Sequence, residues 1–163
     1  MKELQLTSTV ISYNRSEELP AHDRALLQLA TEAAKKAYAP YSQFNVGAAL
    51  RLASGQIILG NNQENVAYPS GLCAERVALF YASANFPDDP VESIAITANT
   101  QNFKINSAVT PCGSCRQVMA EAEKKQKKNI RVIMLGSDNT ILVTETCSQL
   151  LPLMFEANGL MKT

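Results

Sequence analysis

Apolar residues recur every three or four positions in three stretches of this chain, which is the spacing of a helix with one buried face. The first helix is expected from about Pro20 to Ala37, and Pro40 ends it. A second helix is expected to begin near Cys73 and a third at Cys112. The apolar face of the first helix, which should pack on a sheet, contains Leu26, Leu27, Leu29, Ala30, Ala33, Ala34 and Ala37.

Shorter, largely apolar runs between these helices predict strands. The dipeptide Ser54-Gly55 separates the first two runs, so they should pair as an antiparallel hairpin. The last two runs, joined through Ser137-Asp138-Asn139, should form a second hairpin or a strand with an edge partner. A short helix containing Leu150, Leu151 and Phe155 is expected to complete the chain. The expected strands are Val46–Ala53, Gln56–Gly60, Val91–Ala98, Ile130–Leu135 and Thr140–Val143.

This order of elements predicts an α/β fold, a three-layer α/β/α sandwich on a mixed sheet of about five strands. At 163 residues the chain is long enough for one domain with a sizeable core. We expect residues 20–163 to form that domain. Residues 1–19 are expected to be an N-terminal extension, extended in conformation from Leu4 to Tyr13.

Charge and hydropathy favour a small, nearly neutral ligand. Lys+Arg and Asp+Glu balance at 15 each, which argues against a nucleic-acid or membrane partner. No signal peptide pattern and no apolar run of about 18 residues is present, which indicates a cytoplasmic protein. The lone histidine, His22, is expected at the surface without a function. A lysine cluster should complement the negative end of the third helix rather than bind nucleic acid: Lys124, Lys125, Lys127 and Lys128.

Three cysteines carry the strongest chemical signal. In a reducing compartment cysteines are metal ligands or free thiols more often than disulfides. Cys73 opens the second expected helix, and Cys112 and Cys115 open the third with the spacing of a metal clip. Catalytic zinc takes three protein ligands and keeps a fourth position for water, so these cysteines match one zinc ion per chain. Two helix N-termini would offset part of the thiolate charge.

Two residues beside Cys73 suit a hydrolytic reaction. Zinc lowers the pKa of its water ligand toward about 7, but expelling an amine also needs a proton carrier. Glu75 lies two residues from a ligand in the first helical turn and is the candidate general acid and base, a role worth about 10² to 10⁴ in rate. Arg76 should donate hydrogen bonds to the thiolates and draw off their charge.

Several short blocks of sequence around the cysteines carry a family resemblance. They are Ala39-Pro40-Tyr41-Ser42, Phe44, Val46-Gly47-Ala48-Ala49, Asn62-Gln63-Glu64-Asn65, Cys73-Ala74-Glu75-Arg76, Pro111-Cys112-Gly113-Ser114-Cys115-Arg116-Gln117 and Leu150-Leu151-Pro152. With these blocks, the chain from about Tyr38 to Phe155 resembles cytidine deaminases of the small, homotetrameric, three-cysteine type. It departs from the family pattern at Asn61, at Val66-Ala67 and in a longer loop from Thr100 to Thr110.

The resemblance implies zinc-dependent hydrolysis of cytidine and deoxycytidine to uridine and deoxyuridine, with ammonia released. Cys73, Cys112 and Cys115 would hold the zinc, and Glu75 would carry protons while water attacks C4 of the base.

The same resemblance implies a set of substrate-binding residues. Asn62 and Glu64 would bind the ribose hydroxyls, and Phe44 would pack on the pyrimidine ring. Tyr68 is a further substrate-binding candidate, and Phe155 is a candidate for a neighbouring subunit's site in a homotetramer.

Other interpretations of these residues remain open. A deaminase for a cytosine nucleoside antibiotic of the blasticidin type shares the Pro-Cys-Gly-x-Cys-Arg-Gln block. A structural zinc module would need a fourth ligand, for which Cys147 is the only spare cysteine; we expect Cys147 to be a buried bystander. A redox Cys-x-x-Cys pair would leave Glu75 unexplained. Nucleic-acid deaminases more often place His where this chain has Cys73.

Overall fold

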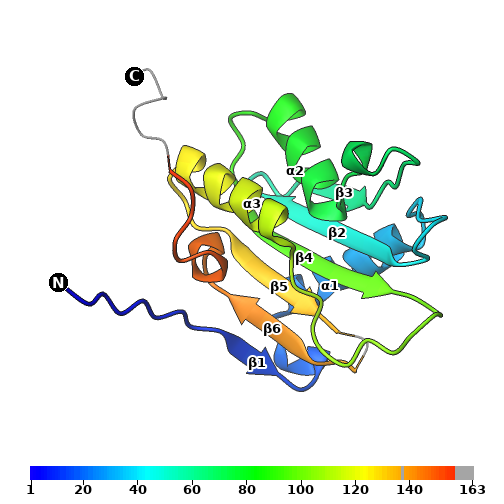
Figure 1. Cartoon of the computed structure of the whole chain (residues 1–163), viewed down its shortest axis with the longest axis horizontal. Coiled ribbons are helices and arrows are strands. Elements are labelled where there is room, and N and C mark those ends of the chain that lie inside the picture. Colours follow the sequence, from blue (N-terminus) through cyan, green and yellow to red (C-terminus); the bar gives the residue numbers. More distant parts are fainter. Residues whose placement is uncertain (137, 157–163) are drawn as a thin grey trace.

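A six-stranded mixed sheet with three α-helices forms the body of the protein, seen in a computed structural model that describes residues 1–136 and 138–156 (Figure 1). The strands are β1 (Ile11–Tyr13), β2 (Asn45–Leu52), β3 (Ile57–Asn61), β4 (Val91–Asn99), β5 (Arg131–Leu135) and β6 (Ile141–Thr144). The α-helices are α1 (Ala21–Ala34), α2 (Ala74–Asn85) and α3 (Gly113–Gln126). Short 3₁₀ helices span Ser16–Glu18, Tyr68–Ser70 and Cys147–Leu150.

The sheet order is β1-β6-β5-β4-β2-β3, and only the β4–β5 pair among the described strands is parallel. Both predicted hairpins are present: β2 pairs with β3, and β5 pairs with β6. Gly55 has a φ of 88° in the first turn, a conformation that glycine adopts without a steric cost. Ser137, part of the second predicted turn, lies outside the described residues.

The helices cover both faces of the sheet, so the predicted three-layer sandwich is confirmed (Figure 1). On one face, α1 packs Leu26, Leu27 and Ala30 into a cluster with sheet residues such as Ala49 and Ile133. The other face carries α2 and α3, and its cluster of buried residues is larger. That cluster includes Leu50, Ala78, Leu79, Ile94 and Met119. Both helices that carry the candidate ligands therefore lie on the same side of the sheet.

The sixth strand comes from the N-terminal segment. Ile11 pairs with Val143 and Tyr13 with Ile141, which places β1 at the sheet edge beside β6. Leu19 is buried in the cluster under α1. The end of residues 1–19 thus joins the sheet and its core instead of lying apart from them.

The predicted C-terminal helix is wrong in extent. The structure has a 3₁₀ helix that ends at Leu150, while Leu151 is nearly extended in φ (−145°) and Phe155 lies beyond the helix. Pro152 explains the difference, because a proline disfavours the helical conformation of the residue before it. Residues 157–163 of the predicted domain lie outside the described residues.

No helix among the described residues has the length and apolar character needed to cross a membrane.

A glycine at the α1 interface gives a test of the packing. A methyl group on Gly47 would lie 2.0 Å from the Ala30 carbonyl oxygen and 2.5 Å from the Ala34 amide nitrogen. We expect Gly47→Ala to lower the free energy of unfolding by about 1–3 kcal/mol or more, because the backbone of α1 has to move. Urea denaturation at a fixed protein concentration measures this. Gly113→Ala is the control, since its added methyl meets nothing within 4 Å; equal losses in both variants would contradict the packing argument.

Candidate active site

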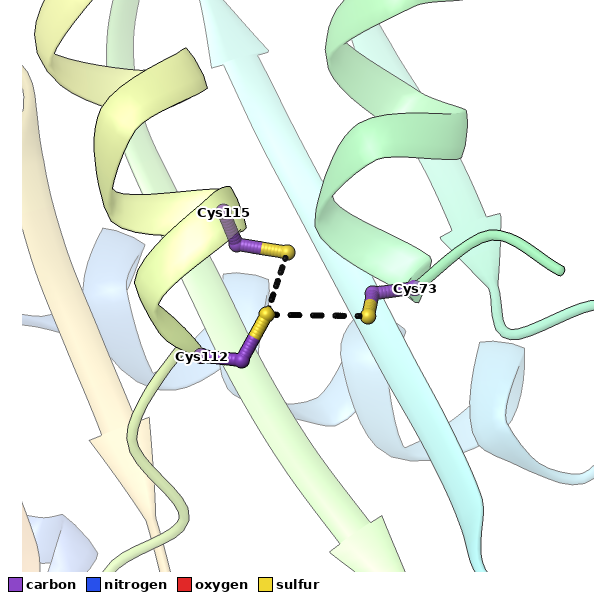
Figure 2. A group of neighbouring side chains, drawn as sticks. All are labelled: Cys73, Cys112 and Cys115. Carbon is purple, nitrogen blue, oxygen red and sulfur yellow. Dashed lines mark hydrogen bonds between the residues drawn. The ribbon is translucent and has the colours of Figure 1, made fainter. Parts of the chain in front are cut away.

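Three thiols meet at the N-termini of α2 and α3 (Figure 2). The Cys73 and Cys112 sulfurs are 3.9 Å apart, those of Cys112 and Cys115 are 3.5 Å apart, and all three lie within 4.8 Å of one another. Tetrahedral zinc with bonds of about 2.3 Å would separate its sulfur ligands by about 3.8 Å. The three cysteines predicted from the sequence are therefore brought together at a spacing that fits zinc.

Local backbone geometry puts these sulfurs in one place. Cys73 is the N-cap of α2 and Cys112 is the N-cap of α3, both with extended backbone angles, while Cys115 is in the first turn of α3. Unpaired N–H groups and the positive end of the dipole at each helix start favour negative charge there. Two helices that begin side by side thus form an environment suited to thiolates.

The cluster itself stabilises a thiolate at Cys73. Hydrogen bonding from the Cys115 thiol, with help from Arg76, lowers the pKa of Cys73 to about 5 against the opposing effect of burial. The same bond to Cys73, together with burial, raises the pKa of Cys115, which is fully buried. Cys73 is therefore the thiol that ionises most readily, and Cys115 holds its proton more tightly. A bound dication would favour release of the proton from Cys115.

Arg76 lies next to this cluster. Its Nη2 atom donates to the Cys73 sulfur at 3.6 Å, because residues three apart on a helix lie on the same face. The bond to Cys73 raises the pKa of Arg76 further above its already high ordinary value. The guanidinium remains charged and offsets the negative charge of the sulfurs.

Glu75 is the buried carboxyl group of the site. Only 3% of its surface is exposed, and its Oε2 atom has no hydrogen-bond partner among the described residues. Burial raises the pKa of Glu75 above the ordinary glutamate value, because a low-dielectric environment disfavours the charged form. An unpaired buried carboxyl oxygen destabilises the fold unless a ligand satisfies it. A raised pKa also suits a group that both accepts and donates protons near neutral pH.

These groups open onto a cavity of about 630 Å³, within the range of small-molecule sites. Every residue proposed from the sequence for the chain's own site lines this cavity except Cys115, which is fully buried. The lining residues are Tyr41, Ser42, Phe44, Val46, Asn62, Gln63, Glu64, Asn65, Tyr68, Gly71, Leu72, Cys73, Glu75, Arg76, Val109, Thr110 and Cys112.

Two polar residues of the cavity lining bind the backbone between Tyr41 and Val46, where the chain enters β2. Asn62 accepts from the Val46 amide at 2.7 Å and donates to the Phe44 carbonyl at 2.9 Å. The Glu64 carboxylate accepts from the Tyr41 amide at 2.9 Å and from the Ser42 hydroxyl, and this second bond lowers the pKa of Glu64. Both side chains are held in place by hydrogen bonds to residues about 20 positions away.

Comparison with known proteins identifies the family to which this chain belongs. A family model described as the cytidine and deoxycytidylate deaminase zinc-binding region matches residues 20–131, more than half of the chain. The chain belongs to this deaminase family. The resemblance inferred from the motifs is confirmed at that level.

Curated and solved deaminases are similar over most of the chain. A cytidine deaminase from Halalkalibacterium halodurans is 42% identical over 135 residues, which cover 83% of this chain and 95% of the relative. The crystal structure of cytidine deaminase from Burkholderia pseudomallei matches with a TM-score of 0.70 and 37% identity, covering 84% of this chain and 100% of that one. Cytidine deaminase from Mycobacterium tuberculosis matches with a TM-score of 0.63 and 29% identity, over 82% and 96% of the two chains. These likenesses concern the whole deaminase domain.

Two residues that the sequence did not indicate as functional, Arg116 and Tyr41, help to build this deaminase site. Arg116 donates from Nε to the Pro111 carbonyl at 2.9 Å and from Nη1 to the Leu150 carbonyl at 3.0 Å, so it fixes the chain just before Cys112. Tyr41 packs edge-on against Tyr68, with ring centroids 6.3 Å apart. Arg116 and Tyr41 lie in the blocks of sequence that match the family. Their contacts with Leu150 and Tyr68 join distant positions, which the spacing of residues does not reveal.

Phe155 does not line the cavity of its own chain. Its side chain is 72% exposed, while its backbone N–H and carbonyl both bond the Gln117 amide group at 3.0 Å. Gln117 thus holds this C-terminal segment against α3. The ring of Phe155 therefore lies on the surface of this chain.

Cys147 is separate from the deaminase cysteine cluster. The side chain is fully buried, its sulfur lies 3.8 Å from the Ile130 carbonyl oxygen, and burial raises the pKa of the thiol. It is not part of the group of three sulfurs that could share a metal. The prediction of a buried thiol is confirmed, and a four-cysteine structural site is disfavoured.

Metal content distinguishes the two classes of cysteine. We expect Cys147→Ala to retain one zinc per chain and Cys112→Ala to lose most of it, because the latter removes one of three donors. Elemental analysis of purified, dialysed protein measures both. Loss of metal on replacing Cys147 would instead favour a structural zinc site with Cys147 as the fourth ligand.

Proposed function

We propose that the protein is a zinc-dependent hydrolase that converts cytidine and deoxycytidine to uridine and deoxyuridine and releases ammonia. One observation carries this proposal: three thiols and a buried carboxyl group converge on one cavity, in a chain of the deaminase family. The named relatives are cytidine deaminases, which supports cytosine nucleosides as substrates.

The donor set fits zinc. Cys73, Cys112 and Cys115 would supply three sulfur ligands, and the distant Cys147 leaves a fourth position for water. Zinc, when bound there, makes a water molecule a stronger nucleophile at neutral pH. Arg76 contributes by withdrawing charge from the Cys73 sulfur through its hydrogen bond.

Glu75 is the proposed proton carrier. Hydrolysis forms a C4–O bond and breaks the bond between C4 and the exocyclic nitrogen, so C4 becomes a carbonyl carbon. Protons must therefore pass from the attacking water to the ring nitrogen and to the departing amine. The carboxyl of Glu75 can accept a proton and donate it, since burial brings its pKa closer to neutral. Its unpaired Oε2 atom provides the position for these transfers.

The remaining cavity residues suit a nucleoside. Phe44 offers a ring to the flat base, and Tyr68 adds an aromatic wall. A carboxylate has about four lone-pair positions, so Glu64 can accept from a sugar hydroxyl beyond its bonds to Tyr41 and Ser42. The Asn62 amide likewise has one N–H left after its bond to Phe44. We propose that these two residues bind the ribose.

A homotetramer and a cytoplasmic location remain part of the proposal. The exposed ring of Phe155, outside its own cavity, supports a subunit contact near the site.

Cytidine turnover tests the function directly. Zinc-loaded protein should convert cytidine to uridine, seen as a change in ultraviolet absorbance, and Glu75→Gln should keep its zinc while losing about 10²-fold or more in kcat, because an amide cannot carry protons. Cysteine cluster variants serve as controls that lose metal and activity together. Full activity in Glu75→Gln would remove this residue from the mechanism, and no conversion by the wild-type protein would overturn cytidine as substrate.

Glu64 gives a separate test of sugar binding. We expect Glu64→Gln to raise KM for cytidine by about tenfold or more, since hydrogen bonds to a charged group contribute about 1.5–3 kcal/mol. The matched control is Glu92→Gln, whose carboxylate bonds Arg51 and does not line the cavity. Steady-state kinetics with both variants measures the effect; an unchanged KM in Glu64→Gln would remove Glu64 from the ribose site.

A further inference from the structure

The loop between β4 and α3 leads from the sheet to the start of α3 (Figure 1). Two of its residues, Val109 and Thr110, line the cavity. Near its end, Ala108 is buried and forms a β-bridge with Gly136, just beyond β5. Near its start, Asn102 donates to the Ser42 carbonyl at 3.3 Å. The loop is therefore attached at both ends, and its path brings residues 102–103 against the segment before β2.

Phe103, the next residue of this loop, stacks on Phe44. The ring centroids are 5.9 Å apart and the planes differ by 10°, which is the geometry of an offset stack. Phe44 lines the cavity and Phe103 does not. Within the part of the chain that the structure describes, Phe103 thus reaches the cavity through the ring of Phe44.

The backbone of Phe44 is already fixed on both sides. Its N–H donates to the Ser42 hydroxyl at 3.0 Å, and its carbonyl accepts from the Asn62 amide at 2.9 Å. The remaining freedom of this residue is rotation of its side chain, and a stacked ring restricts that rotation.

We infer that Phe103 is a positioning residue, which holds the Phe44 ring in the orientation that a cytosine base needs. This inference rests on the proposed function, because it assumes that the base packs on Phe44. Among the described residues, Phe103 is not part of the cavity lining that includes Cys73, Cys112 and Glu75, and its ring contact is with Phe44. Its loss should therefore weaken nucleoside binding and leave the chemical step largely intact.

Kinetics on three variants tests this role. We expect Phe103→Ala to raise KM for cytidine by about 2- to 10-fold with kcat nearly unchanged, the size of effect that one lost aromatic pair produces. Phe103→Tyr should restore the wild-type KM, since it keeps the ring. Lys104→Ala is the matched control on the same exposed loop and should behave as wild type. A wild-type KM in Phe103→Ala, or an equal fall in kcat, would overturn the inference.

Fluorescence supplies a measurement that needs no turnover. The chain contains no tryptophan, so Phe103→Trp introduces a single indole in the stack. Adding uridine, the product, should change the emission of this tryptophan in a saturable way, and Phe44→Ala in the same background should abolish the change. Emission that does not respond to uridine would count against Phe103 as a positioning residue.

The two experiments separate the inference from the function on which it rests. If the wild-type protein converts cytidine and Phe103→Ala has the wild-type KM, only the role of Phe103 is overturned. Absence of conversion overturns the proposed reaction, and the tryptophan response to cytidine then decides whether Phe103 still reports a base on Phe44.

Discussion

The site depends on one constraint: two helices on the same face of the sheet must begin at the same place. Cys73 and Cys112 are both N-caps, so their sulfurs meet only if α2 and α3 start side by side. Close packing of α2 on β3 makes this possible. A Cβ atom at Gly60 would lie 2.4 Å from the Ala74 carbonyl oxygen, so glycine allows the first turn of α2 to approach the strand. Cys73, Glu75 and Arg76 all take their positions from that approach.

Polar side chains then fix the segments that the helices do not hold. Glu123 on α3 accepts from the Ile130 amide and the Cys147 amide at 2.8 Å each, which connects α3 to the start of β5 and to the last 3₁₀ helix. Arg116 fixes the chain before Cys112 in a similar way. Because these bonds satisfy backbone groups in loops, the surroundings of the site are ordered without regular secondary structure.

Local patterns predicted most of this structure, and long-range partners explain what they missed. The helices and hairpins follow from hydrophobic spacing and turn residues, and the three cysteines stand out because metal ligands require particular residue types. The extended conformation predicted from Leu4 to Tyr13 includes β1, but the pairing of this three-residue strand with β6, about 130 positions away, has no local signal. The hydrogen bonds of Glu64 to Tyr41 and the stack of Phe103 on Phe44 also join distant segments. Side-chain contacts of this kind depend on how the chain folds. The three candidate metal-binding cysteines, in contrast, can be recognised from residue type and spacing alone.

The meeting of Cys73 and Cys112 also has a consequence for chain entropy. The two residues are 39 positions apart, and the intervening chain contains α2, β4 and the loop that carries Phe103. A cation bound to both sulfurs closes this stretch into a loop, which restricts the unfolded chain more than the folded one. The atoms proposed to activate water would then also reduce the freedom of the segment that forms one wall of the cavity. Loss of the cation would therefore increase the freedom of that wall as well as remove the activation of water.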